Sequence, residues 1–94
     1  MLTAQAKWTT ENGSKYLQQL CKHFAHKIEV TFSETEGRAT LPPGPAHLTA
    51  DATGLWVEVT AQDADGLDLA KAVIDSHLKR FAFREGFETM PWEG

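Results

Sequence analysis

Residues 46–60 read AHLTADATGLWVEVT, and they give the clearest structural pattern in the chain. Apolar and polar residues alternate before and after a turn at residues 51–54. Alternation with a period of two is typical of a strand that buries one face. The run from Leu55 to Thr60 is the clearest strand in the sequence. Two such runs joined by a short polar turn predict an antiparallel hairpin.

The same alternation extends outward on the N-terminal side. Residues 28–33 and 38–41 alternate around a polar loop, and residues 2–9 form a further alternating run at the start of the chain. The pattern stops at Pro42-Pro43-Gly44-Pro45. Proline cannot donate a backbone hydrogen bond, so these four residues predict a rim loop or an edge of the sheet.

Two other segments change to the period of an α-helix. Between residues 14 and 26, the apolar side chains fall on one helical face. A second helix follows Asp63, a residue suited to cap it, and ends at Gly86. Its expected inward face consists of Leu67, Ala70, Val73, Ile74, His77, Leu78 and Phe81.

The element order is therefore β-α-β-β-β-β-α-β, with the last strand expected in the tail at residues 87–92. Two helices and a series of short hairpins predict an α+β fold, a two-layer sandwich with both helices on one face of a mostly antiparallel sheet. Its 94 residues suit a single domain, residues 1–94.

Composition limits where the protein acts and what it binds. The formal net charge is −4, which argues against nucleic-acid binding. No apolar run approaches the roughly 18 residues of a membrane helix, and no secretory signal is visible. The single cysteine cannot form an internal disulfide. Together these features predict a cytoplasmic protein that binds neither nucleic acid nor membrane, although local basic clusters leave an anionic partner open.

The first candidate cluster lies on the first helix. His23 and His26 are three residues apart, so both can face one side and share a metal ion. A metal site needs three or four ligands, and Cys21 lies about 160° around the helix from His23. We therefore predict no bound metal and no cofactor. In the favoured interpretation, His23 borders the core and His26 ends the helix, where a cationic side chain interacts favourably with the helix dipole. A metal or catalytic role for the two histidines is the alternative.

The second helix carries the other candidates. His77 lies among apolar residues on the inward face and needs a hydrogen-bond partner there, or it acts as an acid-base or ligand group in a cavity. Arg80 and Arg84 are four residues apart and could hold one carboxylate or phosphate. Equally, they could pair with Glu85, Asp51 or Glu88 and fix the helix to the sheet.

Trp56 points away from the apolar residues beside it in the 55–60 strand. It is therefore expected on the open face of the sheet, where it marks a binding surface or a dimer interface, unless the N-terminal strand or the tail covers it. The sequence holds no phosphate-binding glycine loop, no C-x-x-C, no H-E-x-x-H and no G-x-S-x-G.

Three stretches resemble a known family: YLQQLCKHFAHK at 16–27, LTAD at 48–51 and HLKRFAFRE at 77–85. They are similar to a bacterial family of small cytoplasmic proteins, the domain of unknown function 2218, over nearly the whole chain. The family has no established activity, but some members lie near iron and siderophore genes. The resemblance implies one site whose residues are His23, His26, Asp51, His77, Arg80, Arg84 and Glu85.

Some members of that family carry the name of a dihydroxyheptenedioate aldolase. Such chemistry belongs to a (β/α)₈ barrel of about 250 residues, which this chain is too short to form. We expect a non-enzymatic binding or accessory module for a small anion, a metal complex or a protein partner, including a homodimer. The alternative is a small enzyme that uses His77 or His23 as acid-base and Arg80 or Arg84 to hold an anionic substrate.

Overall fold

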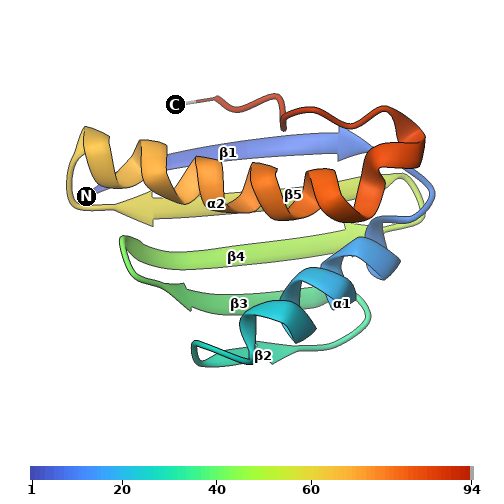
Figure 1. Cartoon of the computed structure of the whole chain (residues 1–94), viewed down its shortest axis with the longest axis horizontal. Helices are drawn as coiled ribbons and strands as arrows, with labels where there is room; N and C mark the ends of the chain where they lie inside the picture. Colours follow the sequence, from blue (N-terminus) through green and yellow to red (C-terminus); the bar gives the residue numbers. More distant parts are fainter. Residues whose placement is uncertain (94) are drawn as a thin grey trace.

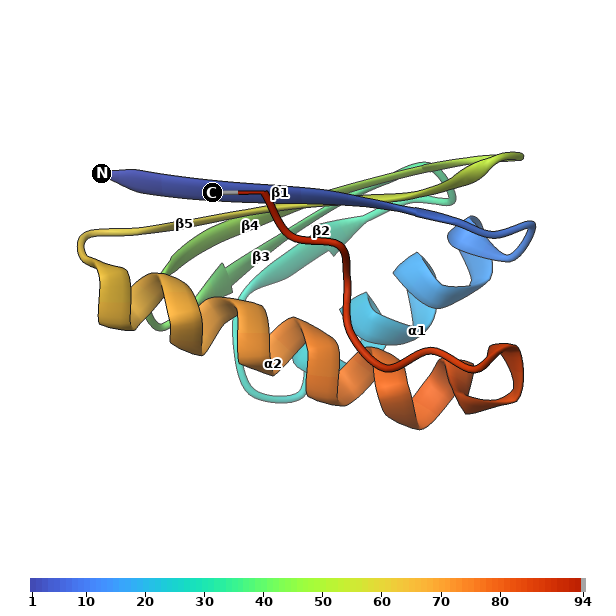
Figure 2. The ribbon, with the colours of Figure 1, turned by 90° about the horizontal axis from the view of Figure 1, so that it is seen from above.

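The computed structural model describes residues 1–93 and confirms the predicted α+β architecture. Five strands form one antiparallel sheet in the order β1-β5-β4-β3-β2, and both helices cover the same face of it (Figures 1 and 2). The elements are β1 (Leu2–Thr9), α1 (Gly13–Phe24), β2 (Val30–Phe32), β3 (Glu36–Leu41), β4 (Gly44–Asp51), β5 (Gly54–Ala61), α2 (Ala64–Ala82) and the short 3-10 helix η1 (Phe83–Glu85).

The core lies between the sheet and the helices, as the two periodicities predict. In β5, the alternate residues Leu55, Val57 and Val59 are buried, while Trp56 and Glu58 are exposed on the other face. The buried stripe of α2 consists of Leu67, Ala70, Ile74, Leu78 and Ala82. Val73, His77 and Phe81 flank that stripe and are only partly buried.

The proline-rich segment is divided between a turn and a strand. Pro42 and Pro43 form the β3–β4 turn, but Gly44 and Pro45 begin β4, which lies between β3 and β5. Proline is tolerated there because the strand is only beginning. A Cβ atom on Gly44 would lie 2.2 Å from the carbonyl oxygen of Thr60, so this close approach of two strands requires glycine.

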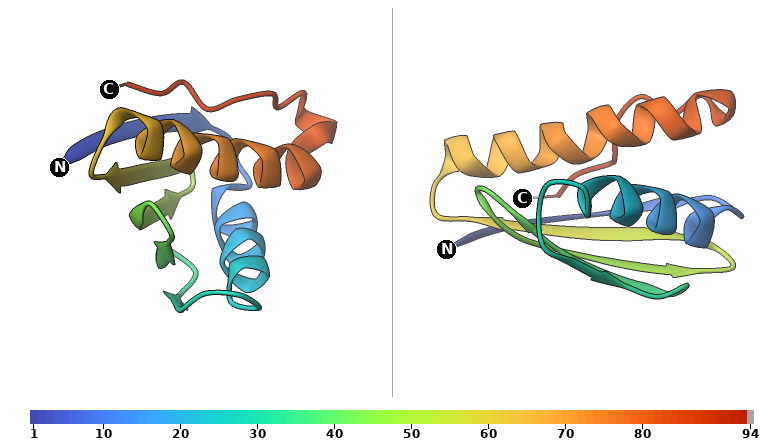
Figure 3. Two further views of the ribbon diagram at one scale, coloured as in Figure 1. Left: turned by 60° about the vertical axis from the view of Figure 1, so that its left-hand side comes forward. Right: turned by 60° about the horizontal axis from the view of Figure 1, so that its bottom comes forward.

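The tail after η1 runs back along β1, as Figure 3 shows. Its expected strand is reduced to one bridge, in which Gln5 and Glu93 exchange backbone hydrogen bonds of 2.9 and 2.8 Å. Asp75 of α2 holds the tail by accepting from Thr89 Oγ1 (2.6 Å) and Met90 N (2.9 Å), and also from the indole N–H of Trp92. The tail is therefore fixed by this carboxylate and by the burial of Phe87 and Met90 more than by strand pairing.

Among residues 1–93, neither helix combines the length and the apolar character that crossing a membrane requires.

Candidate functional site

The end of α1 and the middle of α2 bring two of the predicted residues into contact. The imidazole rings of His23 and His77 lie with their centroids 4.7 Å apart, inclined at 52°. Phe24 packs edge-on against His77 at 5.0 Å, and Phe81 lies 6.2 Å from His23. The residues are 54 positions apart in the sequence, so only the packing of α1 on α2 creates this pair.

His77 finds the hydrogen-bond partner that its half-buried position requires. Its Nδ1 lies 2.6 Å from the carbonyl oxygen of Val73, one turn earlier in α2. A carbonyl oxygen only accepts, so Nδ1 carries the proton and donates it. The Nε2 atom of the neutral ring is then left as an acceptor, and it becomes a donor only when the ring is protonated.

The surroundings of His23 are positively charged. Its pKa is lowered, first by burial of part of the ring and then by the positive charges of His77 and Arg80, with smaller effects from His26 and Lys27. No carboxylate contributes to this shift. A chain with a formal net charge of −4 thus presents a basic cluster where its two helices meet.

Glu85 lies elsewhere and has a structural role. Its carboxylate accepts hydrogen bonds from Thr10 Oγ1 (2.8 Å), Asn12 Nδ2 (3.0 Å) and the hydroxyl of Tyr16. The hydrogen bond from Tyr16 is the main cause that lowers the pKa of Glu85. Burial, and then the hydrogen bond and charge of Glu85, raise the pKa of Tyr16 to about 12. These contacts join η1 to the loop before α1 and to the first turn of α1.

Asp51 and Arg84 are also separate from the histidine pair. Asp51 closes the β4–β5 turn by accepting from the backbone N–H groups of Thr53 and Gly54, at 2.8 and 3.0 Å, and from the Thr53 hydroxyl. The hydrogen bonds from Thr53 lower its pKa. Arg84 is exposed in η1, with its guanidinium 5.8 Å from the ring of Phe83.

The structure therefore brings together His23, His77 and Arg80, with His26 nearby, and leaves the other predicted residues apart. Arg84 is separated from Arg80 because α2 ends at Ala82. The three-residue period of η1 breaks the four-residue spacing that would place Arg84 above Arg80. Among residues 1–93, no group of three or more histidine, cysteine or acidic side chains is arranged to hold a metal ion.

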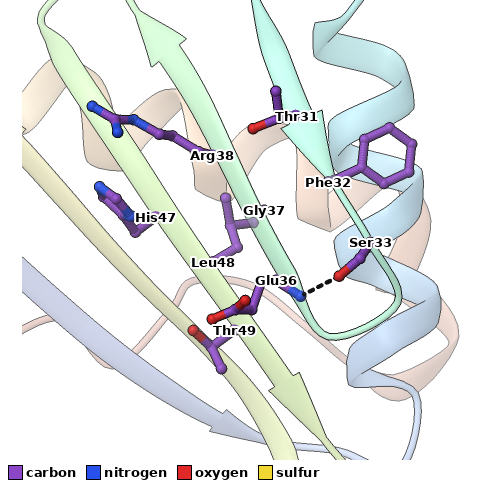
Figure 4. Close-up of a pocket in the computed structure, with 9 residues that line it drawn as sticks. All are labelled: Thr31, Phe32, Ser33, Glu36, Gly37, Arg38, His47, Leu48 and Thr49. Atoms are coloured by element: carbon purple, nitrogen blue, oxygen red, sulfur yellow. Dashed lines mark hydrogen bonds between the residues drawn. The ribbon is translucent and has the colours of Figure 1, made fainter.

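The opposite face of the sheet is open and holds a second group of residues. Trp56 is 38% exposed, and the ammonium group of Lys7 lies 4.1 Å from the centre of its ring. A depression of about 420 Å³ lies over β3 and β4 beside Arg38 and His47 (Figure 4). A second depression, of about 470 Å³, lies beside Trp56 and Glu58. The sequence pattern predicts Trp56 on this face, but it does not single out Arg38, His47 and Glu58, which only the strand register aligns.

A solved structure and a protein family resemble this chain. No curated protein matches it significantly. The NMR structure of PA4090 from Pseudomonas aeruginosa is similar, with a TM-score of 0.81 and 28% sequence identity; the match covers 99% of this chain and 96% of that one. Residues 5–93 match the model of a family described as an uncharacterized protein conserved in bacteria. The chain therefore belongs to this family, the domain of unknown function 2218.

Proposed function

We propose that this chain is a non-enzymatic cytoplasmic module that binds a small oxyanion between its two helices. The observation that carries the proposal is the contact between the His23 and His77 rings, whose centroids lie 4.7 Å apart, beside Arg80, whose positive charge contributes to the lowered pKa of His23. Like charges held this close repel each other unless an anion lies among them. The two acidic residues first considered as neutralising partners, Asp51 and Glu85, make their hydrogen bonds elsewhere.

The cluster has the donors that an oxyanion requires. The guanidinium of Arg80 can bind two oxygens at once, and an imidazolium forms charge-assisted hydrogen bonds. The Nδ1 proton of His77 is already engaged by Val73. The other ring nitrogen, Nε2, donates to a ligand only when it carries a proton. The pKa of His23 is lowered, so the affinity of the cluster for an anion is expected to rise as the pH falls and His23 gains its proton.

An enzyme that uses the same residues is the second candidate. His23 or His77 would act as acid-base, and Arg80 would hold an anionic substrate. General acid-base catalysis gains from excluding water, and His23 is exposed. Binding without chemistry needs no such enclosure and fits this position better. A negatively charged metal complex belongs to the same ligand class and would agree with the association of the family with iron and siderophore genes.

Thermal unfolding with added anions tests the proposal. Phosphate, sulfate, citrate and ferric citrate are the probes. An anion at about ten times its Kd stabilises the folded state by about 1.4 kcal/mol, which raises Tm by roughly 7 °C for a domain of this size. Arg80→Ala should lose this increase and keep nearly the wild-type Tm without anion. Lys79→Ala removes a neighbouring exposed cation and serves as the matched control. This variant should still show the increase in Tm when the anion is added.

Two results would refute the proposal. One is a wild-type protein whose Tm responds to none of the anions. The other is an Arg80→Ala variant that melts far below the wild type without anion, since Arg80 would then stabilise the fold rather than a ligand.

A further inference from the structure

The helix-free face of the sheet presents a polar row that crosses all five strands. The strand register places Gln5 opposite Glu58, Glu58 opposite His47, His47 opposite Arg38, and Arg38 opposite Thr31. All five side chains are exposed. Directly paired side chains in an antiparallel sheet lie about 5 Å apart, so these residues form one continuous line.

The charges in this row are arranged symmetrically about β4. His47 is at the centre, with the negative Glu58 on one side and the positive Arg38 on the other. A two-fold axis parallel to the central strand brings the positive side of one copy over the negative side of the other. A sheet face with opposite charges on its two sides is therefore complementary to a second copy of itself.

The neighbouring row also carries opposite charges on the two sides of β4, with the signs reversed, although the two charged residues are not equally far from that strand. Here Lys7 pairs with Trp56, Trp56 with Thr49, and Thr49 with Glu36. The positive residue now lies on β1 and the negative one on β3. Lys7 begins two strands from β4 and Glu36 only one, but the Lys7 ammonium lies over Trp56 of β5, 4.1 Å from the ring centre. The same rotation therefore brings the two charges close to each other.

We propose that a second copy of the chain packs on this face, related by a two-fold axis that runs along β4. The rotation places Arg38 of each copy opposite Glu58 of the other, and Glu36 of each copy beside Lys7 of the other. Two His47 side chains meet at the axis. Stacked sheets lie about 10 Å apart, a distance that side chains from both faces fill.

Trp56 also fits this arrangement. The rotation carries its ring from β5 onto the other copy's β3, beside Glu36 and Thr49. These two residues line the depression of about 420 Å³ visible in Figure 4. An exposed tryptophan that enters a partner's depression is typical of the residues that dominate interface energies.

The size of the surface predicts a weak dimer. Strand lengths and ordinary strand spacing give a face of about 500 Å² per copy, or about 1,000 Å² buried in total. This lies near the lower limit of specific interfaces, where complexes form and dissociate readily. The dimer should therefore appear only as the protein concentration rises, with a Kd on the order of micromolar or weaker.

Charge exchange tests the pairing, with analytical ultracentrifugation of the full chain as the readout. Arg38→Glu and Glu58→Arg should each weaken self-association about tenfold or more, since every dimer would hold two like-charged pairs. An equal mixture of the two variants should associate as well as the wild type, because each contact between unlike copies is again a pair of opposite charges. Lys22→Glu, on the helix side, makes the same change of net charge as Arg38→Glu and should leave association unchanged.

The inference is overturned if the wild type remains monomeric at millimolar concentration, or if the mixture associates no better than either variant alone. Should a charge variant fail to fold, Trp56→Ala provides the second test, with an expected loss of at least about tenfold in self-association. Unchanged association in Trp56→Ala would also overturn the inference. Arg38, Glu58 and Trp56 lie on the sheet face away from the helices that carry the histidine pair, so the anion response can fail or succeed independently of self-association.

Discussion

Removing the carboxylate of Glu85 should separate its structural role from any binding role. Glu85→Ala deprives two buried hydroxyl groups, those of Thr10 and Tyr16, of their acceptor. An unsatisfied buried polar group costs about 1–3 kcal/mol. Because Glu85 itself is exposed, water can replace part of the lost acceptor. We therefore expect a loss of about 2 kcal/mol in the free energy of unfolding, or roughly 10 °C in Tm.

Tyr16 reports the same interaction directly, because it is the only tyrosine in the chain. Its pKa of about 12 is raised first by burial, then by the hydrogen bond with Glu85 and the charge of Glu85. Glu85→Gln removes the charge and keeps an acceptor, and Glu85→Ala removes both. The tyrosinate absorbance should thus give a pKa that falls from wild type to Glu85→Gln to Glu85→Ala. It should stay above the ordinary value of 10 because burial persists.

The sign of the pH dependence follows from this shift. Between pH 10 and 12 the unfolded chain has already lost the Tyr16 proton that the folded chain keeps. The contribution of Tyr16 to stability is therefore complete below pH 10 and is lost as the pH rises toward 12. A wild-type pKa near 10, or the same pKa in all three proteins, would show that the Tyr16–Glu85 contact is not formed.

Three further changes test other parts of the fold. The pKa of His23 is lowered from 6.5, so the unfolded chain binds this proton more readily than the folded chain. Stability should therefore decrease as the pH falls below about 6.5. In His23→Gln, the decrease of Tm between pH 7 and pH 5 should be smaller. Asp75→Ala should lower the free energy of unfolding in urea by about 2 kcal/mol and speed hydrogen exchange at the Met90 amide. Unchanged exchange would show that Asp75 does not hold the tail. In Gly13→Ala the new Cβ would lie 2.5 Å from the carbonyl oxygen of Gly54, so urea unfolding should show a loss of about 1–3 kcal/mol where an ordinary helix position would gain stability.

Most of the fold follows from local patterns in the sequence. Period-two runs predict the strands, and the helical stripes predict which faces are buried. The exceptions occur where tertiary contacts override a local rule. Pro45 begins a central strand because the strand starts beside the β3–β4 turn. The tail, expected to be a strand, is held by Asp75 through side-chain contacts that have no period.

The candidate site is less visible in the sequence because its residues are distant along the chain. The sequence suggests His23 and His77 individually, but only the packing of α1 on α2 brings them within 4.7 Å. Local spacing would keep Arg84 in line with Arg80 only if α2 continued, and it ends at Ala82. No pattern links Glu85 to Tyr16, since a carboxylate that accepts from a distant hydroxyl leaves no periodic signal.

The same limit applies to the open face of the sheet. Alternation predicts that Glu58 and His47 are exposed, because it assigns each residue to a face. It does not predict that they are neighbours. That relation depends on the register of strand pairing, which turn geometry and the buried face determine together.

The most direct test of anion binding between the helices is a pH titration of the histidine side chains by NMR, with and without phosphate. An anion beside the ring favours the imidazolium, so phosphate should raise the pKa of His23 above the lowered value of the free protein. By linkage, the affinity for phosphate should increase as the pH falls. Phosphate should not change the signals of His47, which lies on the opposite face of the sheet. A His23 pKa that is the same with and without phosphate, or an equal effect of phosphate at His47, would show that no anion binds specifically beside His23.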